Sequence, residues 1–304
     1  MAPYEAPWWL PGGHLQTLAG ALGPAPRIAW RRERWDTPDG DFIDLDWAPG
    51  PARGPLVALF HGLEGGSSSH YARRIARGAV AAGLRVVVPH FRGCSGSLNR
   101  LPRAYHSGDS EEVAWILRRL GADYAVGISL GGNALLKYLG EAGAAAVPRR
   151  AVAVSAPLDV AACGRALDRG LNRRLYTRLF LFTLKAKALA KISLGWLAAD
   201  RGRVARVATL HEFDDLVTAP LHGFRDADDY WRRASSVPLL RRIAAPTLLL
   251  NARNDPFMPP QVLDAVDDRL PAVMLEFPRA GGHAGFPGRG DWLARRVIEF
   301  LASA

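Results

Sequence analysis

A serine stands between two glycines in the pentapeptide GISLG (residues 127–131), at the junction of two kinds of sequence. Residues 123–128 (DYAVGI) predict a short buried strand, and residues 130–141 (LGGNALLKYLGE) place apolar side chains at helical spacing. Glycines let a strand and the helix after it approach closely, so this turn would hold the Ser129 hydroxyl exposed above a helix N-terminus. An ordinary N-cap serine beside turn glycines would have the same sequence. The rest of the chain must therefore decide whether Ser129 is a nucleophile or an N-cap residue.

Apolar runs alternate with helical segments along most of the chain, which favours a mostly parallel sheet covered on both faces. Alternating residues flank a turn signal at Pro38-Asp39-Gly40 and predict an N-terminal hairpin that opens the sheet. Further strands are expected at residues 55–60, 84–91, 149–157, 245–252 and 272–278. Helices are expected at residues 71–83, from a cap at Ser107 or Ser110 to about residue 122, and at 291–303.

One long segment interrupts this alternation. Residues 159 to about 236 read as helices and loops inserted between two strands. A length of 304 residues would accommodate two small domains, but one α/β domain over residues 1–304 with a helical cap insertion is the simpler architecture.

The composition narrows the class of protein. The formal net charge is +10, and all but four of the 39 basic residues are arginine, yet no zinc-finger, RNP or dense basic motif accompanies them. We therefore expect no nucleic-acid partner. The N-terminal residues lack the pattern of a signal peptide, and no apolar run is long enough for a membrane span. With Cys94 and Cys163 too few for a metal cluster, a cytoplasmic protein is the expectation.

A serine becomes a nucleophile when a base takes its proton, and that base needs an acid to orient it. In doubly wound sheets such groups lie at the carboxyl ends of strands. His283 fits the base, because it lies in the glycine-rich loop FPRAGGHAGF between the last expected strand and the last helix.

Several aspartates compete for the role of the acid. Asp255 follows the strand at 245–252 and is stiffened by Pro256, which makes it the favoured candidate. Asp159 follows the preceding strand of the sheet, and the pair Asp214 and Asp215 lies within the insertion. The order Ser129, Asp255, His283 matches the order expected of a serine hydrolase of this architecture.

Acyl transfer also needs N–H donors for the developing oxyanion. The amide of Leu130, directly after the serine, is one candidate donor. The second should come from the glycine-rich loop HGLEGGSSSHY (residues 61–71), where Leu63 is favoured over Glu64. Alone, this loop would read as a turn without a role.

These candidate residues, in this order, resemble the α/β-hydrolase fold. The sequence motifs around them resemble those of the bacterial YheT-like hydrolases, relatives of the eukaryotic ABHD1/2/3 and plant EMB8 proteins. The resemblance runs from Trp8 to Phe300 through the motifs WWLPGGHLQTL, HGLEGGSSSHY, FRGCSGS, YHSGDSEEV, GISLGGNALLKYLGE, FDDLVTAP, NARNDPF and GGHAGF. It implies a carboxylic-ester hydrolase whose triad falls on Ser129, Asp255 and His283. Ser97 departs from the family pattern, which favours glutamate there, in a loop expected near the pocket entrance.

The expected activity is esterase- or lipase-like hydrolysis of small to medium acyl esters through an acyl-enzyme, with no metal or organic cofactor. A thioesterase or acyltransferase would use the same triad, and a sensor that binds an apolar ligand is the non-enzyme alternative. Residues 160–206 carry eleven Lys/Arg against two acids, Asp168 and Asp200. A basic amphipathic segment of this kind fits either a solvated lid or peripheral contact with an anionic membrane.

Overall fold

Eight strands form one sheet within residues 2–288 and 290–303, the part of the chain that the computed structural model describes. The strand order is β1-β2-β4-β3-β5-β6-β7-β8, antiparallel for the hairpin β1–β2 and for β2 on β4, and parallel from β4 onward. The strands are β1 (Arg31–Asp36), β2 (Phe42–Trp47), β3 (Leu56–Phe60), β4 (Arg85–Pro89), β5 (Tyr124–Ile128), β6 (Arg150–Val154), β7 (Thr247–Leu250) and β8 (Val273–Glu276). The predicted hairpin and mostly parallel sheet are confirmed.

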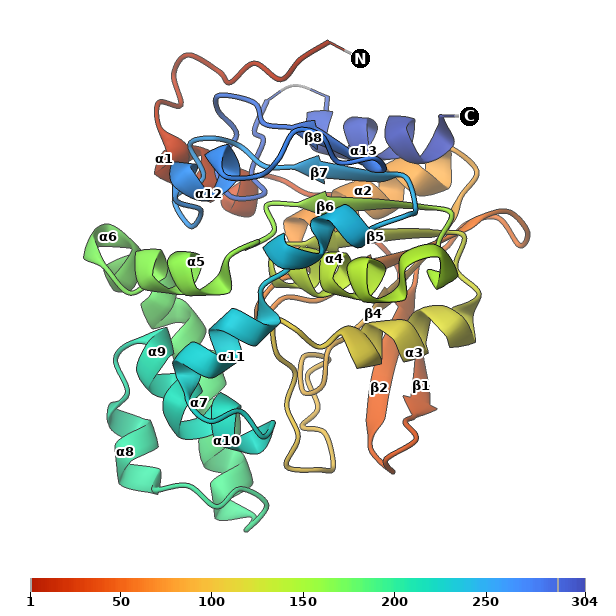
Figure 1. Cartoon of the computed structure of the whole chain (residues 1–304). Helices are drawn as coiled ribbons and strands as arrows, with labels where there is room; N and C mark the ends of the chain where they lie inside the picture. The colour runs from red at the N-terminus through yellow and green to blue at the C-terminus, as the bar shows by residue number, and fades with distance from the viewer. Residues whose placement is uncertain (1, 289, 304) are drawn as a thin grey trace.

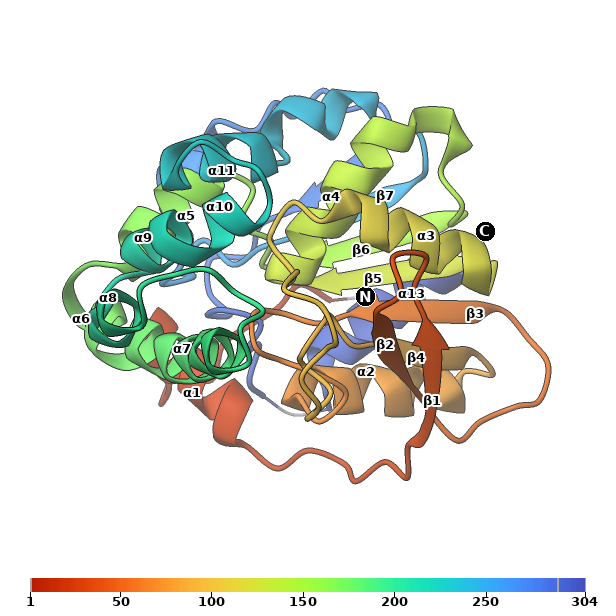
Figure 2. The same cartoon turned by 90° about the horizontal axis from the view of Figure 1, so that it is seen from below.

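Helices cover both faces of this sheet (Figures 1 and 2). On one face lie α2 (His70–Ala81) and α13 (Trp292–Ala302), and on the other lie α3 (Ser110–Leu120) and α4 (Leu130–Ala142). Successive strand residues enter different cores: Val57 and Leu59 pack with α2 and α13, whereas Ala58 and Phe60 pack with α3 and α4. This alternation explains why the central strands are apolar on both sides.

The segment between β6 and β7 is helical, as expected. Figure 1 shows it beyond the ends of the strands, with α5 following β6. It comprises α5 (Val160–Leu167), α6 (Gly170–Asn172), the π-helical turn η2 (Arg173–Thr177), α7 (Arg178–Ser193), α8 (Arg201–Arg206), α9 (Leu210–Phe213), the π-helical turn η3 (Asp214–Thr218), α10 (Ala219–Leu221) and α11 (Ala227–Ala234). We call residues 160–234 the cap. It has an apolar core of its own, which includes Leu181, Phe213 and Trp231.

Several elements differ from expectation. The N-terminal segment contains a helix, α1 (Gly13–Leu22), and the short elements α12 (Pro260–Asp264), η1 (Gly143–Ala145) and η4 (Val237–Arg242) were also not foreseen. Helix α3 begins at Ser110 after Asp109, so neither Ser107 nor Ser110 is its N-cap residue. Most of the observed strands are shorter than the apolar runs that predict them, because those runs continue into the buried loops where the sheet ends. Among the described residues, every helix is too short or too polar to cross a bilayer.

Candidate active site

Ser129 lies at the sharp turn between β5 and α4. Its backbone adopts φ 55° and ψ −122°, a region that non-glycine residues rarely occupy, and its N–H donates to the carbonyl of Val154 at 2.8 Å. A Cβ atom at Gly127 would lie 2.5 Å from the Gly131 carbonyl oxygen, and one at Gly131 would lie 2.6 Å from that of Phe60. The two glycines therefore let the strands and the helix close around a strained serine, which argues for a functional turn over an ordinary cap.

The predicted base and acid lie next to this serine. His283 Nε2 is 2.9 Å from Ser129 Oγ, and His283 Nδ1 is 2.8 Å from Asp255 Oδ2. The other carboxylate oxygen of Asp255 accepts the Phe257 N–H at 2.8 Å, so this buried side chain is fixed at both oxygens. The three residues lie in the loops after β5, β7 and β8, which meet at the carboxyl edge of the sheet.

The rival aspartates have other partners. Asp159 is the N-cap of α5 and accepts the Ala162 N–H at 2.9 Å. Asp214 accepts hydrogen bonds from Thr218 and Trp231 inside the cap, and Asp215 accepts the Ala227 N–H. The structure thus brings Asp255, and none of its three rivals, into contact with the His283 imidazole.

Helix α1 supports the histidine loop, a role that sequence reasoning missed. Thr17 Oγ1 accepts the His283 N–H at 2.8 Å, and Gln16 Oε1 accepts the Gly281 N–H at 2.7 Å. The same Gln16 oxygen accepts the side-chain amide of Asn254 at 2.9 Å, which ties the loop after β7 to the loop after β8. These residues belong to the segment GGHLQTL, so the available signal was a polar motif outside the sheet pattern.

Two backbone amides are free to meet an oxyanion. Leu63 and Leu130 N–H make no hydrogen bond to any residue that the structure describes. Glu64 N–H, the alternative donor, already donates to the Tyr105 hydroxyl at 2.8 Å. Because Gly62 packs closely enough that an added Cβ would be 3.1 Å from Ser129 Cβ, the Leu63 loop lies directly beside the serine.

His61 holds the start of that loop. Its Nε2 accepts the Phe91 N–H at 3.0 Å, which leaves Nδ1 as the donor to the Gly62 carbonyl at 2.8 Å. Burial lowers the pKa of His61 to about 3, so the imidazole stays neutral and keeps this tautomer at physiological pH. The residue therefore positions the turn and does not titrate with the site.

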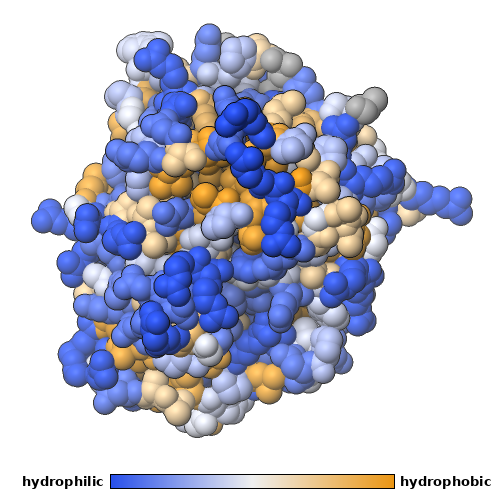
Figure 3. Space-filling model, in the orientation of Figure 1, coloured by the Kyte–Doolittle hydropathy of each residue, from blue (hydrophilic) through white to orange (hydrophobic). Residues whose placement is uncertain are grey.

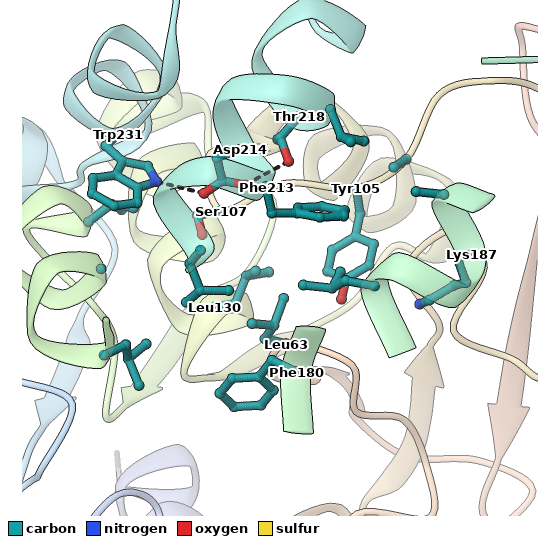
Figure 4. Close-up of a pocket in the computed structure, with 18 of the residues that line it drawn as sticks. Leu63, Tyr105, Ser107, Leu130, Phe180, Lys187, Phe213, Asp214, Thr218 and Trp231 are labelled. Carbon is teal, nitrogen blue, oxygen red and sulfur yellow. Dashed lines mark hydrogen bonds between the residues drawn. The ribbon is translucent and has the colours of Figure 1, made fainter. Parts of the chain in front are cut away.

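A pocket of about 140 Å³ runs from Ser129 and His283 into the cap. Figure 4 shows Leu63 and Leu130 at one side of it and Trp231 and Asp214 at another. Its lining is mostly apolar and includes Val160, Leu167, Phe180, Leu184, Leu197, Leu210, Phe213, Val217, Leu221 and Phe257. The loop after β4 contributes Asn99, Ala104, Tyr105 and Ser107, whereas Ser97 itself is exposed. Such a pocket suits an acyl chain better than a polar ligand.

Charged side chains also line this pocket, namely Arg92, Lys187, Lys191 and Asp214. Lys187 of α7 forms an ion pair with Glu64, whose carboxylate also accepts the Tyr105 hydroxyl, so the cap is joined to the loop that bears Leu63. Deeper in the cap, burial raises the pKa of Asp214 to about 6 despite its bonds to Thr218 and Trp231 (Figure 4).

Within residues 2–288 and 290–303, no group of three or more His, Cys, Asp or Glu side chains is placed to hold a metal ion. Cys94 and Cys163 are free thiols, and burial raises the pKa of each, that of Cys94 to about 11.

Known proteins resemble this chain in sequence and in fold. The family model described as alpha/beta hydrolase fold matches residues 55–289, which is most of the chain. The chain belongs to the α/β-hydrolase family. The protein named "Putative esterase YheT" of Escherichia coli K12 is 40% identical over 313 residues, covering 95% of this chain and 90% of its own. The resemblance to the YheT-like branch is therefore confirmed.

Other α/β hydrolases show the same relationship at greater distance. Human phospholipase ABHD3 is 28% identical over 318 residues, covering 98% of this chain and 78% of its own length. The solved esterase Pf2001 of Pyrococcus furiosus superposes with a TM-score of 0.62 over 90% of this chain and 91% of that one. At 17% identity the latter shows the shared fold alone.

Proposed function

We propose that this α/β hydrolase is a serine carboxylic-ester hydrolase that works through an acyl-enzyme. The observation that carries the proposal is the contact of His283 Nε2 with Ser129 Oγ at 2.9 Å, while Nδ1 is held by Asp255. The names of its relatives, which include an esterase and a phospholipase, support ester hydrolysis as the reaction class.

In the proposed mechanism, Ser129 Oγ attacks the ester carbonyl carbon while His283 Nε2 takes the hydroxyl proton. Asp255 holds the imidazole with its Nδ1–H toward the carboxylate and stabilises the imidazolium that forms. The free amides of Leu63 and Leu130 donate to the oxyanion, each contributing roughly 3–4 kcal/mol to the transition state.

The tetrahedral intermediate then collapses as His283 gives the proton to the leaving alcohol. Water enters, loses its proton to the same imidazole and attacks the acyl-enzyme, which releases the carboxylic acid and restores Ser129. Each proton that is transferred in the cycle is therefore accepted and then donated by the imidazole of His283.

The substrate class follows from the pocket. Its apolar lining beside Ser129 suits small to medium acyl chains, and the enclosing cap helices limit their length. We expect rates for p-nitrophenyl esters to rise from acetate to medium chains and to fall by palmitate.

The test compares the intact protein with Ser129→Ala and Ser97→Ala on that ester series. Ser129→Ala should lose activity by at least about ten-thousandfold and lose labelling by a fluorophosphonate probe. Ser97→Ala, which changes an exposed serine, should keep both. Thermal unfolding of each variant checks that the loss is chemical.

Two outcomes would contradict the proposal. An intact protein that neither cleaves any ester of the series nor reacts with the probe is not a serine esterase. A Ser129→Ala protein that retains the activity would move the nucleophile to another residue.

A further inference from the structure

The cap carries large apolar side chains on a surface that faces solvent. Leu171, Leu175, Leu179 and Phe182 recur along the continuous helical run α6–η2–α7, and the last two are 67% and 76% exposed. Leu175, Leu179 and Phe182 line a surface groove together with Leu181 and Val207. We call this surface the outer face of α7.

The opposite side of α7 is also apolar and already has a partner. Phe180, Leu184 and Ala188 line the pocket beside Ser129, and Lys187 and Lys191 anchor the helix to the loops beneath it. A surface helix normally buries one stripe and shows a polar opposite face. Helix α7 is apolar on both sides, so its outer face is unexplained by the packing of the cap.

Basic residues surround this outer face. Arg173, Arg174, Arg178 and Lys185 line the same groove, and the described residues that line it include no Asp or Glu. Apolar side chains inside a rim of cations are the pattern of segments that lie in a membrane interface. By contrast, hydrophilic side chains cover most of the cap surface that Figure 3 shows.

The N-terminal segment also carries large apolar side chains that are exposed to solvent. Trp8 and Trp9 are 91% and 62% exposed and lie shortly before α1, which begins at Gly13. Helix α1 contacts the start of the helical run, because the rings of His14 and Tyr176 stack at 5.8 Å. Tryptophan is enriched where proteins meet the headgroup region of a bilayer.

We propose that the outer face of α7 docks onto the surface of an anionic lipid bilayer. The leucines and Phe182 enter the interface, and the surrounding arginines meet lipid phosphates. A second copy of this chain is a poorer occupant, since a two-fold contact through this face would bring the same cluster of cations against itself.

The test is co-sedimentation with phosphatidylcholine vesicles, with and without phosphatidylglycerol, at low and high salt. The intact protein should bind the anionic vesicles at low salt and lose binding as salt rises. Leu179→Ser/Phe182→Ser should weaken binding by at least about tenfold, because the apolar contribution is removed. Arg174→Glu/Arg178→Glu should weaken it by roughly 25-fold or more.

A matched control separates the face from the overall charge. Arg53→Glu/Arg118→Glu changes the net charge equally at exposed positions outside the groove and should bind nearly as well as the intact protein. Because none of these residues lines the pocket, all variants should keep the same rate on a soluble acetate ester.

Three results would overturn the proposal: no binding to anionic vesicles at low salt, an equal loss in the control, or a dimer that requires Leu179 and Phe182 in place of vesicle binding. Sedimentation velocity without vesicles detects the dimer. Binding is measured without turnover, so this outcome is independent of whether the esterase proposal holds.

Discussion

The residues around Ser129 and the residues of the cap are held in place by different means. The loops that bear Ser129, Asp255 and His283 are fixed by a strained backbone and by buried hydrogen bonds to the sheet and α1. The cap packs on its own small core and meets the loops beneath it through side chains such as Lys187. In the proposed function, the chemistry lies on this rigid, hydrogen-bonded part and the selection of acyl chains on the separately packed cap.

The largest effect should come from the rigid part. In Asp255→Asn, the Phe257 N–H keeps the amide oxygen, so the amide nitrogen faces His283 Nδ1 and forces the wrong imidazole tautomer. We expect kcat on a soluble ester to fall by about ten-thousandfold with little change in melting temperature. Asp159→Asn, which alters only the N-cap residue of helix α5, should keep the wild-type kcat. Equal losses in both variants would contradict the assignment of Asp255 as the acid.

The buried carboxyl of the cap should make stability depend on pH. Burial raises the pKa of Asp214 to about 6 from 3.8, so the folded state favours the protonated form. As pH rises from about 4 to 7, ionisation costs the intact protein up to about 3 kcal/mol relative to Asp214→Asn. Urea unfolding across this range measures the difference. The exposed Asp228→Asn serves as control, and parallel pH profiles for Asp214→Asn and the intact protein would refute the expectation.

Removing the ion pair between the cap and the loop that bears Leu63 should have a smaller effect on stability, and one confined to the cap. Lys187→Met leaves the Glu64 carboxylate, only 8% exposed, without its cation. Local opening of residues 160–234 should become easier by about 2 kcal/mol, seen as faster amide hydrogen exchange, while β5 and β6 keep their protection. Lys187→Arg should restore most of it. Uniform acceleration across the whole chain would show that cap and sheet open together.

The smallest effect tests the support from α1. Thr17→Val keeps the side-chain shape but removes the acceptor of the His283 N–H, so the histidine loop loses one anchor. We expect kcat to fall by about tenfold, with an altered pH profile and a small change in KM. Thr17→Ser keeps the hydroxyl and should stay near the intact enzyme. Equal behaviour of the two variants would remove this role.

Residues that follow strands were predictable, because the carboxyl ends of parallel strands meet at one edge. Ser129, Asp255 and His283 each follow an apolar run, so the sequence alone predicts that they meet. The Gln16 contact with Gly281 spans 265 residues and joins a helix that carries no alternation signal, so nothing local announces it. The sequence identifies His61 only as the start of a loop. Its tautomer could not be predicted, because it depends on the Phe91 amide, which is distant in the sequence.

The arrangement of the cap was the least predictable part. An insertion of helices could be seen from the missing strand pattern, but α7 is apolar on both sides and therefore gives no clear inner face. Which side meets the pocket depends on contacts with Phe213, Val217 and other residues of the cap.

The π-helical turn at Arg173–Thr177 has an evolutionary consequence. Such a turn holds one residue more than an α-helical turn, and one residue corresponds to about 100° of rotation along a helix. Removing that extra residue would turn α7 by about 100° relative to the residues before it. Loss of a single codon there would therefore bring a different set of α7 side chains toward the pocket in one step, whereas point substitutions would have to change those side chains one at a time.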